Sequence, residues 1–432
     1  MENKLPKGWV ETNFENIISV MTNGRNFKQE DVFVEGYFPI SRIETISQET
    51  IDLKKVKYVK IEKSDIEKYC LKIGDILFSH INSDKHLGKT AIYKQDVNLV
   101  HGINLLLLRT EKKISPDFTN FYLQYFRFRG GFLNIAQRAV NQSSINQKKL
   151  SLIPFPLPPL AEQERIVAKL DALFAQHEAM KKALGRIPQL LKDFRQQVLT
   201  KAVLNDYGYT KLKDFLIDIK YGTSKKSDYG IDGIPILRIP NIDDGKINSK
   251  DLKYSILDKK ESDILSLKIN DILIIRSNGS INLVGQSAIV SKDFENYSYA
   301  GYLIRIRLSD KYNPAYLNYI FKSNFIRSQM IDTSRSTSGV NNINSKEIQE
   351  LNVPLIPLKK QKEIVSRIES LFTKAESIEK RYQILKEKID NLPQAILHKA
   401  FKGELVPQLP TDGDAKDLLE EILKLKKEVK KK

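Results

Sequence analysis

Cysteine, histidine and long apolar segments are scarce in this chain, and each scarcity excludes a class of protein. A single cysteine, Cys70, stands among the 432 residues, which excludes an internal disulfide and a cysteine-based zinc finger. Apolar stretches such as 103–108 have only the length of a strand, whereas a helix needs about 20 apolar residues to span a bilayer. The segment Met1–Trp9 lacks the apolar core of a signal peptide. We therefore expect a cytoplasmic protein.

Signals for catalysis are also missing. No glycine-rich loop of the Walker type occurs, and no pair of carboxylates stands with a lysine as in a nuclease site. His80, His86 and His101 lie close in sequence, but the equivalent part of the second half has no histidine, which disfavours a catalytic zinc site. The segment 313–316 reads Asn-Pro-Ala-Tyr and lacks the second proline of the amino-methyltransferase loop, so the start of a helix explains it better. We predict a non-catalytic chain without metal or cofactor.

Positive charge is in excess. The chain has 70 lysines and arginines against 53 acidic residues, a formal net charge of +17. A chain this basic usually has a polyanionic partner, most often nucleic acid. The alternative is a basic surface without such a partner.

Two heptad repeats form the strongest pattern. In residues 160–203 and 358–401 apolar positions follow steps of four and three, and each position of the second set lies 198 residues after one of the first (364 − 166 = 198). A heptad seam faces a partner helix, so the two helices are expected to pack against each other, with His177 as a tolerated polar layer. The seam residues are Ile166, Leu170, Leu173, Met180, Leu184 and Leu191 in the first helix and Ile364, Ile368, Leu371, Ile378, Leu385 and Ile389 in the second.

Each helix contains a proline that limits its straight length. A straight helix from residue 166 to 198 would span about 48 Å at about 1.5 Å per residue. Pro188 follows Gly185 in the first helix, and Pro393 lies near the end of the second. A proline inside a helix costs about 3 kcal/mol unless the helix bends or restarts, so we expect a kink or break at each.

The duplication extends beyond the helices. Residues 71–77 read Leu-Lys-Ile-Gly-Asp-Ile-Leu, and residues 267–273 read Leu-Lys-Ile-Asn-Asp-Ile-Leu. Short β-branched or aromatic runs predict strands, and a proline after a capping residue predicts a helix start. We expect strands at 76–78, 104–109, 272–275 and 302–308, helices at 116–128 and 314–329, and extended proline-containing segments at 150–160 and 348–358. The fold class is α+β, a mixed fold in two copies, followed by a tail with a short basic helix at 415–429.

The two proline-rich segments lead into helices in a characteristic way. Residues 156–167 read Pro-Leu-Pro-Pro-Leu-Ala-Glu-Gln-Glu-Arg-Ile-Val, and residues 354–365 read Pro-Leu-Ile-Pro-Leu-Lys-Lys-Gln-Lys-Glu-Ile-Val. With the end of the second helix at 400–406 and the order domain, helix, domain, helix, nearly the whole chain resembles the specificity subunits of Type I restriction–modification systems. Lysines replace the usual acidic flank of Gln361, which puts in doubt any contact made by Glu162 in the first copy.

The resemblance implies two target recognition domains, each reading one half of a split sequence in double-stranded DNA. It also implies that the two helices form an antiparallel coiled coil, with a pseudo-two-fold repeat, that sets the spacing and docks two methyltransferase subunits, with restriction subunits where present. The expected ranges are 1–155 for the first recognition domain, 156–204 for the first helical region, 205–353 for the second recognition domain, 354–406 for the second helical region and 407–432 for the basic tail.

Polar, turn-rich segments at equivalent places of the two copies are the candidate DNA contacts, because cations hold phosphates and forked or amide side chains read base edges. Asparagine and serine are also ordinary loop residues, so any single one is as well explained by the loop itself. For Arg42 and Arg238 the sequence does not decide between a phosphate contact and a structural ion pair. The candidates are Asn23, Arg25, Lys28, His80, Asn82, Lys85, Arg138, Gln142, Ser144 and Asn146 in the first copy and Lys220, Tyr221, Lys225, Lys226, Arg276, Asn278, Asn282, Arg335, Asn341, Asn342 and Asn344 in the second.

Two other classes of function stay open at the level of sequence. A stand-alone methyltransferase or nuclease with an unrecognised site would act on DNA without partners. A coiled-coil interaction protein with incidental charge would lack salt-sensitive DNA binding.

Overall fold

Each half of the chain is built around a four-stranded antiparallel sheet, and both sheets have the same strand order. The computed structural model describes residues 5–140, 142–204, 206–333, 335–337 and 340–430, without the side chains of 335–337 and 429–430. The chain divides into unit 1, residues 1–183 with 385–432, and unit 2, residues 184–384. The sheet of unit 1 has the order β2-β8-β5-β7, and that of unit 2 has the order β13-β22-β18-β20, which confirms the duplicated α+β fold.

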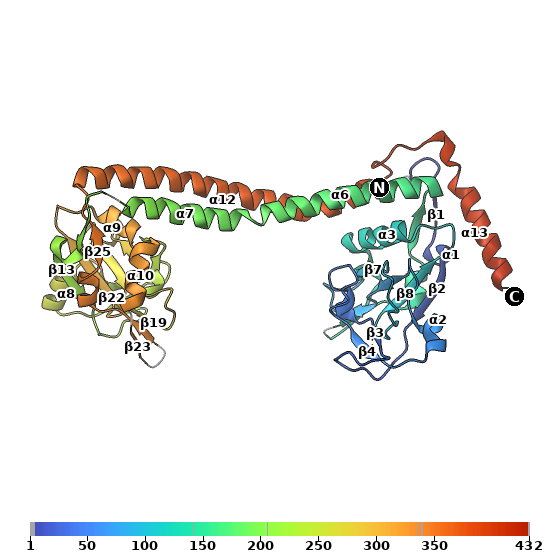
Figure 1. Ribbon diagram of the computed structural model, residues 1–432, viewed down its shortest axis with the longest axis horizontal. Helices are drawn as coiled ribbons and strands as arrows, with labels where there is room; N and C mark the ends of the chain where they lie inside the picture. Colours follow the sequence, from blue (N-terminus) through green and yellow to red (C-terminus); the bar gives the residue numbers. More distant parts are fainter. Residues whose placement is uncertain (1–4, 141, 205, 334, 338–339, 431–432) are drawn as a thin grey trace. The chain divides into compact units, whose positions relative to one another are not determined.

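Unit 1 alternates short strands with short helices before its long helix begins (Figure 1). Its elements are β1 (Val10–Asn13), α1 (Phe14–Ile17), β2 (Ile18–Asn23), β3 (Phe38–Ile40), β4 (Lys57–Val59), α2 (Ile66–Tyr69), β5 (Ile76–Phe78), β6 (Ile81–Asn82), β7 (Thr90–Ile92), β8 (Leu106–Thr110), α3 (Pro116–Phe128), α4 (Gly131–Ile135), β9 (Gln137–Ala139), β10 (Gln142–Ser144), α5 (Gln147–Ser151), β11 (Pro154–Leu157) and α6 (Leu160–Leu184).

Unit 2 repeats this order with small insertions. Its elements are α7 (Ile187–Val203), β12 (Tyr209–Lys211), β13 (Leu216–Tyr221), β14 (Ile234–Leu237), β15 (Ile242–Asp243), β16 (Lys246–Ile247), β17 (Lys253–Ser255), α8 (Lys259–Leu265), β18 (Ile272–Ile275), β19 (Ser277–Asn278), β20 (Ser287–Ile289), β21 (Ser298–Tyr299), β22 (Leu303–Leu308), α9 (Pro314–Ile320), α10 (Asn324–Thr333), β23 (Arg335–Thr337), β24 (Val340–Asn342), α11 (Ser345–Gln349) and β25 (Asn352–Pro354). Helix α12 (Leu358–Phe401) begins in unit 2 and ends in unit 1, where α13 (Ala415–Lys430) follows.

The central strands β5 and β18 are apolar throughout because both faces of each sheet are covered. Ile76 and Phe78 of β5 point into a core shared with α3, whereas Leu77 between them joins a second cluster on the other face. In unit 2, Ile272 and Ile274 likewise face one cluster and Leu273 the other. This alternation follows from the two-residue period of a strand, and it explains why the runs read as continuously hydrophobic.

An arginine–aspartate pair braces each sheet at the same place. Asp75 is 1% exposed and accepts bonds from Arg109 Nε at 2.6 Å and Arg109 Nη2 at 2.7 Å. In unit 2, Asp271 is 1% exposed and accepts from Arg307 Nε and Nη2, each at 2.7 Å. The repeated motif around each aspartate therefore has a structural role, because it ties the start of a central strand to its neighbour.

The predicted helices at 116–128 and 314–329 differ in how well local signals predicted their extent. Helix α3 covers the predicted 116–128, and Ser115 Oγ accepts from the Phe118 amide as its N-cap. The predicted helix 314–329 is wrong in its extent, since α9 ends at Ile320 and α10 starts anew at Asn324. The buried Ser323 ends one helix and accepts a hydrogen bond from the Ile326 amide at the start of the next.

The proline-containing segments are extended at 154–157 and 352–354, as expected, but their first residues, 150–151 and 348–349, belong to the short helices α5 and α11. Strand β11 pairs antiparallel with β1, and β25 pairs with β12. The chain then turns into a long helix. In unit 1, α6 runs antiparallel to the end of α12, with Ile166 and Leu170 in one core with Ile396 and Leu397. In unit 2, α7 runs antiparallel to the start of α12, since Arg195 Nη2 lies 2.8 Å from Glu379 and Val203 shares a core with Val365.

The seam residues differ in burial. Leu184, Leu191, Ile368 and Ile389 are buried with Ile166 and Leu170, and Leu173, Ile364 and Leu371 are half-buried. His177 is buried, and its Nε2 donates to the Ile389 carbonyl at 2.9 Å, so it is a satisfied polar layer. Met180, Ile378 and Leu385 are 42%, 48% and 46% exposed, contrary to a closed seam, because two helices leave their flanks open and the first helix is interrupted nearby.

The two prolines behave differently. Helix α6 ends at Leu184 and α7 starts at Ile187 with Pro188 in its first turn, so the expected break occurs there. Helix α12 continues through Pro393, so no break occurs at the second. Within the residues described, no helix is both long and apolar enough to cross a bilayer.

Candidate nucleic-acid interface

In unit 2 a small sheet brings together two loops that lie 60 residues apart (277 and 337). Strand β24 pairs with β19 through Ser277 and Asn342, and with β23 on its other side. Strand β19 follows central strand β18 at its end, after Arg276. The second and third candidate loops therefore form one three-stranded surface at one end of the main sheet.

The first candidate loop of unit 2 joins this surface through Tyr221. Its hydroxyl accepts from the Ser345 amide at 2.8 Å and donates to Ser345 Oγ at 3.2 Å. The Arg276 guanidinium lies over the Tyr221 ring, 4.6 Å from the centroid, and its Nε donates to Asn342 Oδ1 at 3.3 Å. Stacking on the ring and the amide contact hold Arg276 in a fixed direction, which suits a side chain that reads a base edge.

Unit 1 has the same arrangement with other residues. Strand β10 pairs with β6 through Ser143 and Asn82 and with β9 on the other side. Asn23, at the end of β2, accepts from Gln147 Nε2 at 2.9 Å. The three candidate loops of this unit thus meet as well, at the equivalent end of its sheet.

The candidate cations fall into two groups. Lys225 lies 2.8 Å from Glu261 and 3.4 Å from Asp258, so it holds its own loop, and Lys220 and Lys28 have longer contacts of 3.7 and 3.8 Å with acidic neighbours. Arg25 donates to the Tyr69 hydroxyl. Among the described residues no ion pair involves Lys85, Arg138, Lys226 or Arg276, which leaves these four available to phosphates or bases.

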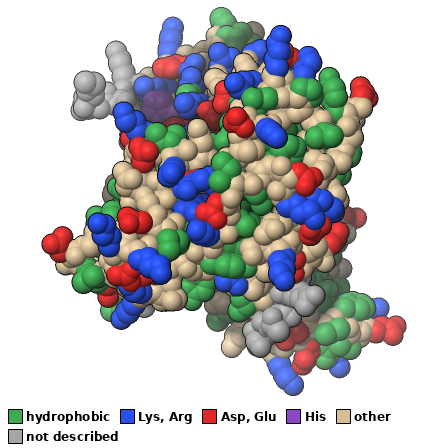
Figure 2. Space-filling model, turned by 90° about the vertical axis from the view of Figure 1, so that its left-hand side faces the viewer, with side chains coloured by type: hydrophobic (Ala, Val, Ile, Leu, Met, Phe, Trp, Pro, Cys, Tyr) green, Lys and Arg blue, Asp and Glu red, His purple; other side chains and the backbone are tan. Residues whose placement is uncertain are grey.

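Figure 2 shows how cations are distributed on the side of unit 2. Lysines and arginines are interspersed with carboxylates and apolar side chains and form no single cationic patch on the face seen.

Several candidate amides already have structural partners. Asn146 and Asn344 are N-caps, accepting from the Lys149 amide at 2.8 Å and the Glu347 amide at 2.9 Å. Asn278 accepts from the Ser280 amide, Asn82 bonds within its own loop, and Asn341 Nδ2 donates to the Gly279 carbonyl of the neighbouring loop at 3.1 Å. These side chains shape the loops. Gln142 and Asn282 are exposed, and their side-chain amides have no partner among the described residues; Ser144 is half-buried, and the Arg335 side chain lies outside the description.

The structure favours the ion-pair explanation for Arg42 and Arg238. Arg238 Nη2 lies 2.7 Å from the Asp251 carboxylate and 2.9 Å from its carbonyl oxygen, and Arg42 lies 3.6 Å from Glu44. His80 and His101 are buried. Burial lowers the pKa of His80 and His101, which favours neutral imidazoles. No group of metal ligands occurs in the described part of the chain.

Two buried glutamines that the sequence reading did not assign connect each long helix to its unit. Gln163 accepts from the Ser115 amide at 3.0 Å and donates to the Pro158 carbonyl at 2.9 Å. Gln361 makes the same two bonds with Asn313 and Ile356, each at 2.7 Å. Their place in both proline-rich motifs was the available signal. Glu162 beside Gln163 is buried too, and burial raises the pKa of its carboxyl.

Comparisons with known proteins identify relatives along most of the chain. The family described as "Type I restriction modification DNA specificity domain" matches residues 6–189 and 205–387. The Type I restriction enzyme EcoKI specificity subunit of Escherichia coli K12 is 32% identical over 427 residues, covering 94% of this chain and 91% of that protein. The StySPI specificity subunit of Salmonella potsdam is 32% identical, with 94% and 91% covered.

Solved structures with the same fold include the HsdS subunit from Thermoanaerobacter tengcongensis. It has a TM-score of 0.63 at 18% identity, covering 93% of this chain and 98% of that one. A chain from a study of complex assembly and conformational transition of the Type I R-M system has a TM-score of 0.65 at 19% identity, covering 93% and 99%. At these identities the structural match establishes the fold alone.

Proposed function

The chain belongs to the family of Type I restriction–modification DNA specificity subunits, and from this premise we propose that it reads a DNA target in two parts, one with each unit. Its relatives are specificity subunits, the non-catalytic component of such systems. The chain therefore directs the chemistry of other subunits. In the cytoplasm, its partners would be double-stranded DNA, two methyltransferase subunits and, where the system has them, restriction subunits.

The duplicated surface at the loop end of each sheet is the observation that carries this proposal. Both units fold three loops into the same three-stranded arrangement, yet the exposed residues differ. Unit 1 presents Asn23 and Gln142 where unit 2 presents Tyr221 and Val340 (221 − 23 = 198; 340 − 142 = 198). A shared scaffold with different side chains is what two readers of different half-sites require. We assign the readers to residues 1–155 and 205–353.

The contacts divide by chemistry. Lysines such as Lys85 and Lys226 would hold phosphates, which fixes position without sequence information. Arg138, Gln142 and Arg276 can make two-pronged bonds to base edges, each giving about 1–3 kcal/mol of discrimination. Asn82, Asn146, Asn278, Asn341 and Asn344 would act on the shape of the loops.

The long helices would set the distance between half-sites and dock the methyltransferase subunits. Helix α12 has 44 residues, about 66 Å at about 1.5 Å per residue. In unit 2, Leu190, Ile378 and Ile384 are 62%, 48% and 58% exposed on α7 and α12. Apolar side chains exposed on paired helices suit further helices packing alongside. Met180 and Leu385 offer similar exposed positions in unit 1.

Modified-base sequencing of a host genome with and without this gene tests the proposal. Loss of methylation at one bipartite motif is the expected result, and an unchanged methylation pattern would contradict it. Arg276→Ala should relax one half of the motif and leave the other half intact. Exchange of residues 1–155 for those of a relative should change the other half. Relaxation of both halves by either change would contradict separate readers.

Docking on the helices has its own test. Leu190→Glu together with Ile384→Glu should prevent co-purification of the methyltransferase subunits, because the change places charges in an apolar contact. The exposed polar residues Gln189 and Lys388, changed to glutamate on the same helices, form the matched control. Equal loss of assembly in both variants would argue against apolar docking.

A further inference from the structure

The C-terminal helix α13 is a fixed part of unit 1. The Ala415 amide donates to the Gly8 carbonyl at 3.1 Å, and Asp412 just before the helix accepts two bonds of 2.6 Å from Arg165. Ala415 and Ile422 are buried in the main core of the unit. This helix therefore has a defined position beside α1 and β2 (Figure 1).

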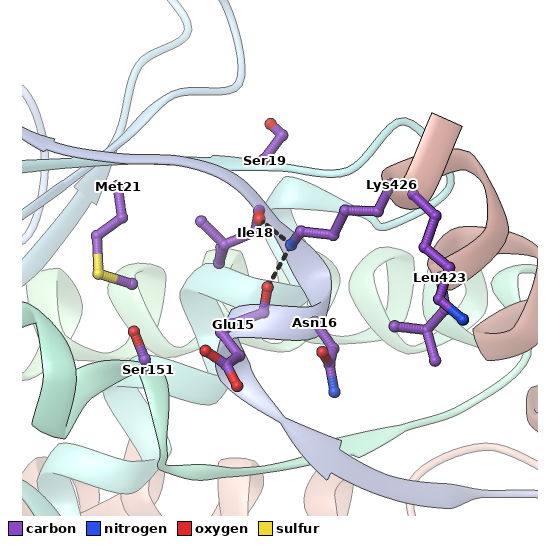
Figure 3. Close-up of a pocket in the computed structure, with 9 residues that line it drawn as sticks. Glu15, Asn16, Ile18, Ser19, Met21, Ser151, Leu423 and Lys426 are labelled. Atoms are coloured by element: carbon purple, nitrogen blue, oxygen red, sulfur yellow. Dashed lines mark hydrogen bonds between the residues drawn. The ribbon is translucent and has the colours of Figure 1, made fainter. Parts of the chain in front are cut away.

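One lysine near the end of α13 anchors it. Lys426 Nζ donates to the carbonyls of Glu15 and Ile18, the latter at 2.6 Å, and lies 3.6 Å from the Glu111 carboxylate. Figure 3 shows this ammonium pointing into the turn where α1 passes into β2. Lys426 is thus committed to the protein.

The charges of α13 are unevenly distributed. Its first half carries Asp417, Glu420 and Glu421, whereas residues 424–430 contain four lysines and one glutamate. Lys424 and Lys427 are exposed, and neither has an ion pair or hydrogen bond among the described residues. Lysines 431 and 432 follow in the sequence. The end of the helix is therefore strongly cationic apart from Lys426.

This cationic end lies beside the strand that leads to the first candidate loop. Lys427 and Leu423 border an open hollow of about 440 Å³ together with Ser19, Met21 and Ser151 (Figure 3). Met21 is two residues from Asn23, about 7 Å along β2 at about 3.3 Å per residue. Glu15 also borders the hollow, so the attraction for an anion resides in the unpaired Lys424 and Lys427 of the helix end.

Unit 2 has no counterpart of this helix among its described residues. The positions of Glu15 and Glu111 are taken by Lys213 and Ser309 (213 − 15 = 198; 309 − 111 = 198). The two glutamates that lie near Lys426 in unit 1 are therefore absent from the equivalent places in unit 2.

We propose that the basic end of α13 is a further DNA contact of unit 1, in which Lys424 and Lys427 hold phosphates beside the half-site that this unit reads. The contact is independent of sequence, so it adds affinity and not discrimination. This inference rests on the proposed function. Each phosphate neutralised contributes about 0.9 to the slope of log K against log salt concentration, so two lysines contribute about 2.

Salt-dependent binding of the complete methyltransferase complex to bipartite DNA tests the inference. The variant carries Lys424→Gln and Lys427→Gln. The matched control carries Lys292→Gln and Lys311→Gln, exposed lysines at the opposite end of the unit 2 sheet, since they follow β20 and β22. Both double changes remove the same charge.

We expect the α13 variant to lower the salt slope by about 2, to weaken binding to matched and unmatched DNA alike, and to leave the methylated motif unchanged. The control should change the slope by less than about 1. Equal slopes for the two variants would overturn the inference, as would loss of methyltransferase assembly in the α13 variant, which would assign the lysines to a protein partner. If the complex with the unchanged chain does not bind bipartite DNA, that result contradicts the proposed function itself. Truncation after Asp414 should reproduce the slope loss.

Discussion

Removal of the Asp271 carboxylate is the sharpest test of how the reading surface is supported. Asp271 accepts two bonds from Arg307 and one from the Lys268 amide at 2.8 Å. It lies immediately before β18, and Arg276 follows the end of that strand. Asp271→Ala would leave a guanidinium without its carboxylate and an amide without its acceptor, both at the edge of the core.

The cost can be estimated from the burial of the pair. Breaking a buried ion pair by removing one partner costs about 3–5 kcal/mol. The Arg307 side chain keeps 21% exposure while Asp271 keeps 1%, so water recovers part of the loss and we expect the lower end, about 3 kcal/mol. The double variant Asp271→Ala, Arg307→Met should regain most of it, because apolar replacement of both partners is often neutral.

Hydrogen exchange measures the effect within one unit, without assuming that the chain unfolds in a single step. A loss of about 3 kcal/mol corresponds to roughly hundredfold faster exchange of amides in β18 and β22, at about 1.4 kcal/mol per factor of ten. The equivalent strands β5 and β8 of unit 1 should be unchanged and serve as the reference. A rise below tenfold in unit 2, or a double variant no better than the single one, would refute the reasoning.

Three further predictions concern stability. Burial raises the pKa of Glu162, and a carboxyl whose pKa is raised on folding favours the folded state only while it is protonated. Glu162→Gln should therefore raise the melting temperature at neutral pH and lose that advantage as the pH falls through the raised pKa. An advantage that stays constant with pH would contradict this explanation. Gln361→Leu should lower the melting temperature by removing two buried bonds, each leaving a group that costs about 1–3 kcal/mol, whereas the exposed control Gln189→Ala should not; equal shifts would count against the assignment. Gly222→Ala should abolish folding of unit 2, because its Cβ would lie 2.2 Å from the Tyr299 carbonyl oxygen, and a normal circular dichroism melt would disprove the steric argument.

Local signals in the sequence were sufficient where the local preference and the tertiary context agree. Ser115 before Pro116 predicted α3, since a capping hydroxyl and a proline both suit a first turn. Pro188 predicted the break between α6 and α7, because Gly185 next to it allows the chain to leave the helix. The duplicated motifs predicted two copies of one fold, and the comparisons confirm the family.

Local signals failed where packing outweighs them. Of the kink or break expected at Pro393, the break does not occur, and Ile396, Leu397 and Ala400 just after it are buried in the core of unit 1. Burial of such side chains contributes about 1.5–3 kcal/mol each for the larger ones, enough to offset the loss of one helical hydrogen bond. The heptad pattern also predicted burial for Met180, Ile378 and Leu385, but these seam residues are exposed because no further helix packs over them among the described residues.

The sequence by itself determined the duplication, the long helices, the strands and the family, because all of these depend on periodicity and order along the chain. Only the tertiary structure decided which loop residues are free to bind. It pairs β24 with β19, and it joins Tyr221 to Ser345 across more than a hundred residues. It also commits Asn146 and Asn344 to helix caps and Lys225 to an ion pair. A side chain's availability depends on neighbours distant in sequence, and such neighbours are set by folding and not by local composition.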